Sequence, residues 1–185
     1  MTHYSRLVLA CVITLSRTCL SQDLPASAVT ASAIAGATLP DDPLKFAMLE
    51  VRAQAFSHVS LAVAAAYLEG PRGYEEAQLR LSATWAYQGG PWTMENRHLL
   101  AIGEAAERYR CRLRLIRSVG QGSFSVRTFD ELYVDLDHGL VRNNLALGVG
   151  AKIGAAVTAE LYHVWVDNHD ARNDNYVLVF LTLRL

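Results

Sequence analysis

Four arginines alternate with apolar or aromatic residues in the middle of this 185-residue chain. The arginines are Arg108, Arg110, Arg112 and Arg114, and the residues between them are Tyr109, Cys111 and Leu113. A period of two places alternate side chains on opposite faces of a β-strand, whereas on a helix the guanidinium groups would scatter around the axis. The segment therefore predicts a strand with one cationic face and one apolar face.

Carboxylates with the same alternation lie further along the chain. A hairpin through Gly120 and Gln121 would place Arg110 or Arg112 opposite Glu131, and Arg108 near Tyr133 or Asp135. Guanidinium and carboxylate groups at that separation form charge-assisted, often bidentate hydrogen bonds. The predicted charge network comprises Arg97, Arg108, Arg110, Arg112, Arg114, Glu131, Asp135, Arg142 and Glu160.

A second pair of residues has the types needed for nucleophilic catalysis. His58 and Ser60 are two positions apart, so on a strand both side chains would share one face, as a base and a nucleophile could. That spacing resembles the spacing in outer-membrane lipid A deacylases, although only these two residues match. The competing interpretation is a polar lining next to a turn.

The same alternation extends over most of the sequence and predicts the elements that carry these residues. From residue 44 onward, nine segments of about ten residues separate polar from apolar positions. Their predicted ranges are 46–55, 58–68, 76–88, 95–104, 108–115, 126–136, 142–152, 156–166 and 176–185. Tilted by about 45°, a ten-residue strand spans the apolar layer of an outer membrane.

These patterns favour an all-β fold, an antiparallel up-and-down transmembrane β-barrel over residues 44–185. Bacterial barrels use an even number of strands, so a weak first strand within residues 29–43 would complete a barrel of about ten; the alternative for that range is a linker. Residues 1–28 are predicted to be an export signal or processed segment, because Arg6 precedes the apolar run 7–16.

Composition narrows the possible partners. A net charge of −1 gives no basic footprint for nucleic acid, and 51% hydrophobic residues without a long apolar run suits a barrel. No cofactor and no metal site is predicted. The expected partners are outer-membrane lipid and the barrel-assembly machinery, and a small anion or ligand is a further possibility inside the barrel.

The order of several short segments resembles a bacterial family known only as a domain of unknown function, whose members are described as outer-membrane β-barrel proteins. The matching segments are Glu95–Leu100, Tyr109–Leu115, Asp130–Val134, Arg142–Gly150 and Ala159–Tyr162. The resemblance implies an outer-membrane barrel and supplies no activity and no catalytic residues.

The sequence leaves three functions open. The first is an outer-membrane barrel with a structural or minor-channel role and an ion-paired polar lumen. The second is an outer-membrane lipid-modifying hydrolase that uses His58 and Ser60. The third is a soluble lipocalin-like binder of a small ligand, in which the apolar face would turn inward.

Overall fold

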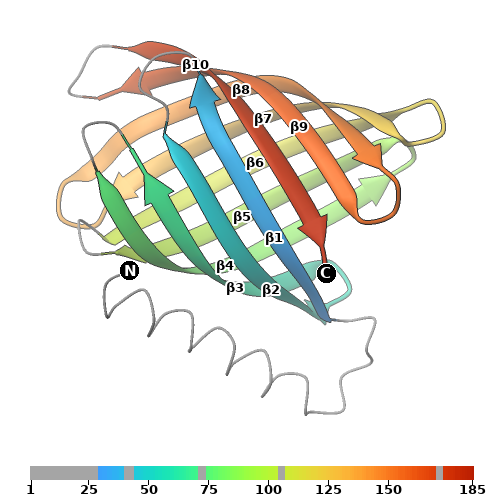
Figure 1. The fold of residues 1–185 in the computed structure, drawn as a ribbon, viewed down its shortest axis with the longest axis horizontal. Helices are drawn as coiled ribbons and strands as arrows, with labels where there is room; N and C mark the ends of the chain where they lie inside the picture. The colour runs from blue at the N-terminus through green and yellow to red at the C-terminus, as the bar shows by residue number, and fades with distance from the viewer. Residues whose placement is uncertain (1–28, 40–43, 71–73, 104–106, 170–172) are drawn as a thin grey trace.

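The structure is a computed structural model that describes residues 29–39, 44–70, 74–103, 107–169 and 173–185. Ten antiparallel strands form one closed barrel in which each strand pairs with its sequence neighbours, and β1 closes the ring against β10 (Figure 1). The strands are β1 (Val29–Leu39), β2 (Lys45–Phe56), β3 (Val59–Glu69), β4 (Glu75–Gly89), β5 (Trp92–Gly103), β6 (Glu107–Val119), β7 (Phe124–Asp135), β8 (Gly139–Ile153), β9 (Val157–Asn168) and β10 (Asp174–Arg184). This confirms the predicted up-and-down barrel of about ten strands.

The tenth strand comes from the range that the sequence left open. Val29–Leu39 forms β1, so the even strand count is met without a linker over these residues. Residues 40–43 and the predicted export segment 1–28 lie outside the described residues. Within the described part of the chain, no helix has the length and apolarity needed to cross a membrane.

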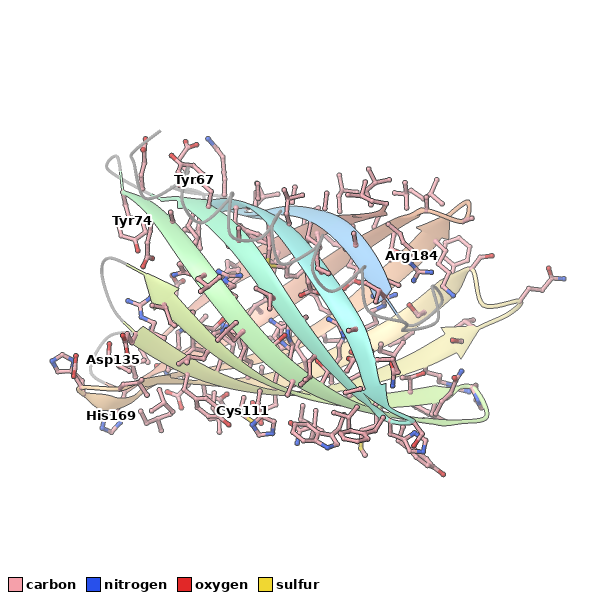
Figure 2. The ribbon with its side chains drawn as sticks, turned by 90° about the horizontal axis from the view of Figure 1, so that it is seen from below. Tyr67, Tyr74, Cys111, Asp135, His169 and Arg184 are labelled. Carbon is pink, nitrogen blue, oxygen red and sulfur yellow. The ribbon has the colours of Figure 1, made fainter. Side chains whose placement is uncertain are left out.

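The strand connections alternate between two ends of the barrel. At one end, here called the turn end, short turns follow β2, β4, β6 and β8. Gly90, Gly120 and Gly154 adopt positive φ in these turns, a conformation that only glycine adopts without steric cost. The opposite end, here called the loop end, carries Tyr67, Tyr74, Asp135 and His169 (Figure 2).

Side-chain exposure shows which face of each strand points outward. On β6, Leu113 is 51% exposed, whereas the side chains of Arg110 and Arg112 are 15% and 18% exposed. The apolar positions of the other strands behave like Leu113, as Leu61, Leu145 and Leu181 show. The barrel therefore turns its apolar face outward, which contradicts the lipocalin-like binder, because that alternative required the apolar face to line the interior.

The interior also contains an apolar cluster, which the prediction of a polar, ion-paired lumen omitted. It occupies one side of the barrel, on the inner faces of β7 to β10 and of β2. Its buried members are Phe129, Ala146, Tyr162, Val164, Val166 and Leu178, with Phe46, Tyr176 and Phe180 packed against them. A large part of the interior is thus filled by side chains, as expected for a barrel of this strand number.

Two inward-facing glycines make room for the aromatic rings of this cluster. Gly36 on β1 lies opposite Phe46 and Gly148 on β8 lies opposite Tyr162. In both cases a Cβ atom on the glycine would collide with the ring of its cross-strand neighbour. The absence of a side chain lets each ring lie flat against the barrel wall.

Candidate functional site

The candidate site is the charged part of the lumen, on the inner faces of β4 to β7 and their partners across the barrel. It is built around three buried or largely buried glutamates, each of which contacts two arginines. These three groups are called the Glu131, Glu50 and Glu160 triads.

The Glu131 triad joins β6 and β7. The register places Arg112 directly opposite Glu131, and Arg112 donates from both Nε and Nη2 to the two carboxylate oxygens, each at 3.0 Å. Arg110 contributes a third guanidinium contact, with Nη2 at 2.9 Å from Oε1. The hydroxyl of Tyr133 also donates to Glu131, over 2.8 Å. One carboxylate is therefore shared between two guanidinium charges.

The Glu50 triad reaches between strands that are not neighbours. Arg52 on β2 lies 2.8 Å from Glu50, and Arg97 on β5 lies 2.9 Å from its other carboxylate oxygen. β3 and β4 separate the two strands, and Ala62 and Ala64 on β3 are small enough to let the arginine reach across the inner surface. The contact ties β2 and β5 together inside the barrel.

The Glu160 triad links β6 and β7 to β9. Arg114 lies 2.8 Å from Glu160, and Arg127 forms a second, very close ion pair with the same carboxylate. Tyr162 donates its hydroxyl to Glu160 over 2.7 Å, and Glu95 lies 3.5 Å from Arg114. The guanidinium of Arg127 lies over Gly150, where a Cβ atom would collide with it.

Arg80 lies on the inner face of β4 and differs from these six arginines. It is 9% exposed, and it donates from Nε and Nη2 to Gln78 Oε1 at 3.0 and 2.8 Å. Gln78 in turn donates to Glu76 over 2.8 Å, so an amide separates this guanidinium from the carboxylate. No carboxylate of the described residues forms an ion pair with Arg80.

Tyr74 closes this chain of contacts at the loop end by donating its hydroxyl to Glu76. Burial, together with the hydrogen bond to Glu76, raises the pKa of Tyr74 to about 12. The phenol is therefore neutral around pH 7 and remains a hydrogen-bond donor.

Two arginines of the predicted charge network, Arg142 and Arg110, contact an aromatic ring. Arg142 stacks on Tyr133, with its guanidinium carbon 4.0 Å from the ring centroid, and Arg110 lies 4.4 Å from the same ring. These are cation–π contacts, which desolvated sites strengthen. Among the described residues, Arg142 thus contacts an aromatic face instead of the expected carboxylate.

Asp135 and Arg108 face each other in the register of β6 and β7, as the sequence suggested. The carboxylate of Asp135, however, accepts from the backbone of Asp137 and His138 at 3.0 and 3.1 Å and contacts the His138 ring at 3.0 Å. Asp135 therefore belongs to the loop-end turn between β7 and β8, because that turn brings backbone N–H groups to it.

Among the described residues, no hydrogen bond joins the predicted catalytic pair, His58 and Ser60. His58 lies in the turn between β2 and β3, where its exposed ring is 6.4 Å from the ring of Tyr87. Ser60 lies on β3 and accepts from Arg52 at 3.4 Å. The spacing argument required an extended strand at position 58, whereas the chain reverses direction there.

Sequence reasoning missed Glu50, Arg52, Arg80 and Arg127 as members of the charged lumen. Alternation along β2 and β4 already places the first three on the polar face of their strands. The contacts of Glu50 with Arg97 and of Arg127 with Glu160 join strands distant in the sequence, and nothing local encodes those pairings. Arg52 and Arg80 bond to residues two positions away on their own strands. Within the described residues, no group of three or more potential metal ligands is present.

Comparison with protein-family models and with curated proteins finds no match. Among solved structures, the chain is similar to the KdgM porin, with a TM-score of 0.51 and 11% identity over 83% of this chain and 97% of the porin. It is also similar to the NanC porin, with a TM-score of 0.53 and 8% identity over 84% of this chain and 100% of that one. The chain shares its fold with outer-membrane porins. At these identities the likeness concerns the fold alone.

Proposed function

We propose that this protein is a minor channel of the bacterial outer membrane whose lumen favours small anions. In a closed barrel the backbone N–H and C=O groups of every strand find partners on a neighbouring strand, which is the condition for β-structure in a bilayer. The outward leucines form the apolar surface that lipid would contact. The porin-like fold and the family resemblance of the sequence support the same location.

Aromatic residues on the outer surface support this placement. Trp85, Tyr87 and Trp92 are exposed toward the turn end of β4 and β5, where interfacial aromatic belts occur in membrane barrels. Bacterial barrels have short periplasmic turns and longer extracellular loops, so in this placement the turn end faces the periplasm and the loop end faces outward. We expect folding to use the barrel-assembly machinery.

The observation that supports anion preference is the ratio of charges inside the barrel. Each of the three triads contains one carboxylate and two guanidinium groups. Arg80 adds a further cation, while Glu95, near Arg114, and Glu76, next to Gln78, contribute two more carboxylates. The described lumen contacts therefore carry a cationic excess, and a ring of like charges selects counter-ions at a constriction.

Planar-bilayer recording tests this function. Purified, folded protein is inserted under a potassium chloride gradient, and the reversal potential gives the chloride-to-potassium permeability ratio. We expect a small conductance with a ratio above one, and a decrease toward one in Arg112→Gln. Arg117→Gln is the matched control, because Arg117 is exposed beside Trp92 and lies outside the triads. A folded barrel with no conductance, or with cation preference, would contradict the proposal.

A further inference from the structure

Arg80 is the starting point, because its charge is buried without direct carboxylate contact among the described residues. Two of its nitrogens bond to a neutral amide, and the third, Nη1, lies 3.8 Å from the Met48 sulfur. A thioether is a weak acceptor. A buried guanidinium normally requires an anionic partner, since an uncompensated buried charge is destabilising.

Two neighbouring guanidinium groups also have an unused donor. The Nε atoms of Arg97 and Arg110 are buried and have no hydrogen-bond partner among the described residues. The Nη2 atom of each group is engaged, in Arg97 with Glu50 and in Arg110 with Glu131. Buried donors without a partner are uncommon in folded proteins and indicate a bound water or ion.

The strand register brings these three arginines together. Arg80 on β4 lies level with Ala101 of β5, and Arg110 on β6 lies level with Leu99. Arg97 is the next inward-facing residue on β5 after Leu99. The three cations therefore occupy adjacent strands within a few residues of one another, where Arg97 and Arg110 repel Arg80 and Glu131 attracts it.

The local charge is not balanced by protein groups. Glu50 is shared between Arg97 and Arg52, and Glu131 is shared between Arg110 and Arg112. Each shared carboxylate leaves one positive charge and Arg80 adds a third, whereas Glu76, separated from Arg80 by the Gln78 amide, contributes one negative charge. In a medium of reduced dielectric constant this repulsion favours a bound counter-ion.

We propose that a small monovalent anion, a halide or the carboxylate of a small organic acid, binds between Arg80, Arg97 and Arg110. The buried side chains of Leu99 and Ala101 lie on the strand between Arg80 and Arg110 and form the wall behind the anion. The proposal rests on the cationic lumen described above and assigns it one specific site. It requires binding at that site and is independent of whether the barrel conducts.

Chlorine-35 NMR on the folded protein in detergent tests the site. Chloride that exchanges with a protein site broadens the bulk resonance, so titration of the line width reports binding. We expect saturable broadening in the native protein and at least a tenfold weaker affinity in Arg80→Gln. Arg117→Gln, which removes an exposed arginine, should match the native protein. Equal saturable broadening in Arg80→Gln would overturn the proposal and show that chloride binds other arginines only.

A second variant covers the case in which Arg80→Gln does not fold. Arg97→Lys keeps a positive charge for Glu50 but removes the Nε–H donor, so we expect weaker broadening in a folded barrel. Unchanged broadening in this variant would contradict the predicted contact. Competition with sodium acetate distinguishes the two ligand sources, because displacement of chloride shows that a carboxylate also enters.

The result of the chloride-binding test can be distinguished from the result of the conductance test of the proposed channel. An anion-selective conductance with no Arg80-dependent chloride binding would overturn the site and leave the function intact. Arg80-dependent binding in a barrel that does not conduct would support the site and contradict the channel.

Discussion

At the scale of single residues, each glutamate of the three triads is shared between two arginines. Glu131 accepts five hydrogen bonds, two from each of two arginines and one from a tyrosine hydroxyl, so these three neighbours depend on one carboxylate. Buried ion pairs of this kind contribute little net stability when complete, because desolvation offsets the attraction. Their loss is costly, because the remaining charges stay buried.

Glu131→Gln is therefore expected to destabilise the barrel strongly. The variant leaves Arg110 and Arg112 without their carboxylate, and removing one partner of a buried pair costs roughly 3–5 kcal/mol. Urea unfolding of the detergent-folded protein measures the change in the free energy of unfolding.

The matched control is Glu69→Gln. Glu69 pairs with Lys45 at the surface, where both side chains are about half exposed, and exposed pairs contribute about 0–1 kcal/mol. Equal effects of the two substitutions would contradict the buried, shared role of Glu131.

At the scale of elements, each strand has one face toward the lumen and one toward the outside of the barrel, and the residues on each face must suit that environment. β6 presents arginine to the lumen and Leu113 and Leu115 to the outside, and a shift of one residue would exchange the two faces. The pairing of Arg112 with Glu131 and the outward leucines therefore specify the same register. This agreement explains why alternation predicted the strands of this protein well.

The outward face of β6 gives a direct prediction. Leu113→Arg would place a guanidinium at the middle of the strand on the lipid side, which costs about 2–4 kcal/mol near the bilayer midplane. Phe124→Arg, at the turn end of β7, should cost only about 0–1 kcal/mol, because it lies near the interface. Unfolding from lipid vesicles compares the two variants, and a neutral Leu113→Arg would argue against a lipid-facing position.

At the scale of the whole molecule, closure and cross-lumen contacts decide the arrangement. β1 pairs with β10 along eight residues, although the two strands are separated by almost the entire described chain. Inside, Arg97 reaches Glu50 and Arg114 reaches Glu160, each across strands that are not paired. Side-chain contacts thus tie together parts of the wall that the backbone does not connect directly.

Thiol labelling tests which side of this closed wall faces lipid. Cys111 lies on the outer face of β6, opposite His98 in the register (Figure 2). In a variant with Cys11→Ser and Cys19→Ser, a charged water-soluble thiol reagent should react slowly with the barrel in lipid vesicles. Reaction should become fast after unfolding in urea. Rapid labelling of the folded protein in vesicles would place Cys111 in contact with water and contradict the membrane assignment.

Alternation with period two is a local property of the chain, so the strands, their two faces and the barrel could be predicted from the sequence. The sequence also identified most of the arginine ladder of β6 and its neighbour Glu131, which a single hairpin brings together. Only the tertiary structure decided the partners of Glu50, Arg97 and Arg127, the isolation of Arg80 from carboxylates and the apolar cluster inside the barrel. Those features depend on barrel closure and on side chains that meet across the lumen, and neither is encoded in the spacing of residues along one strand.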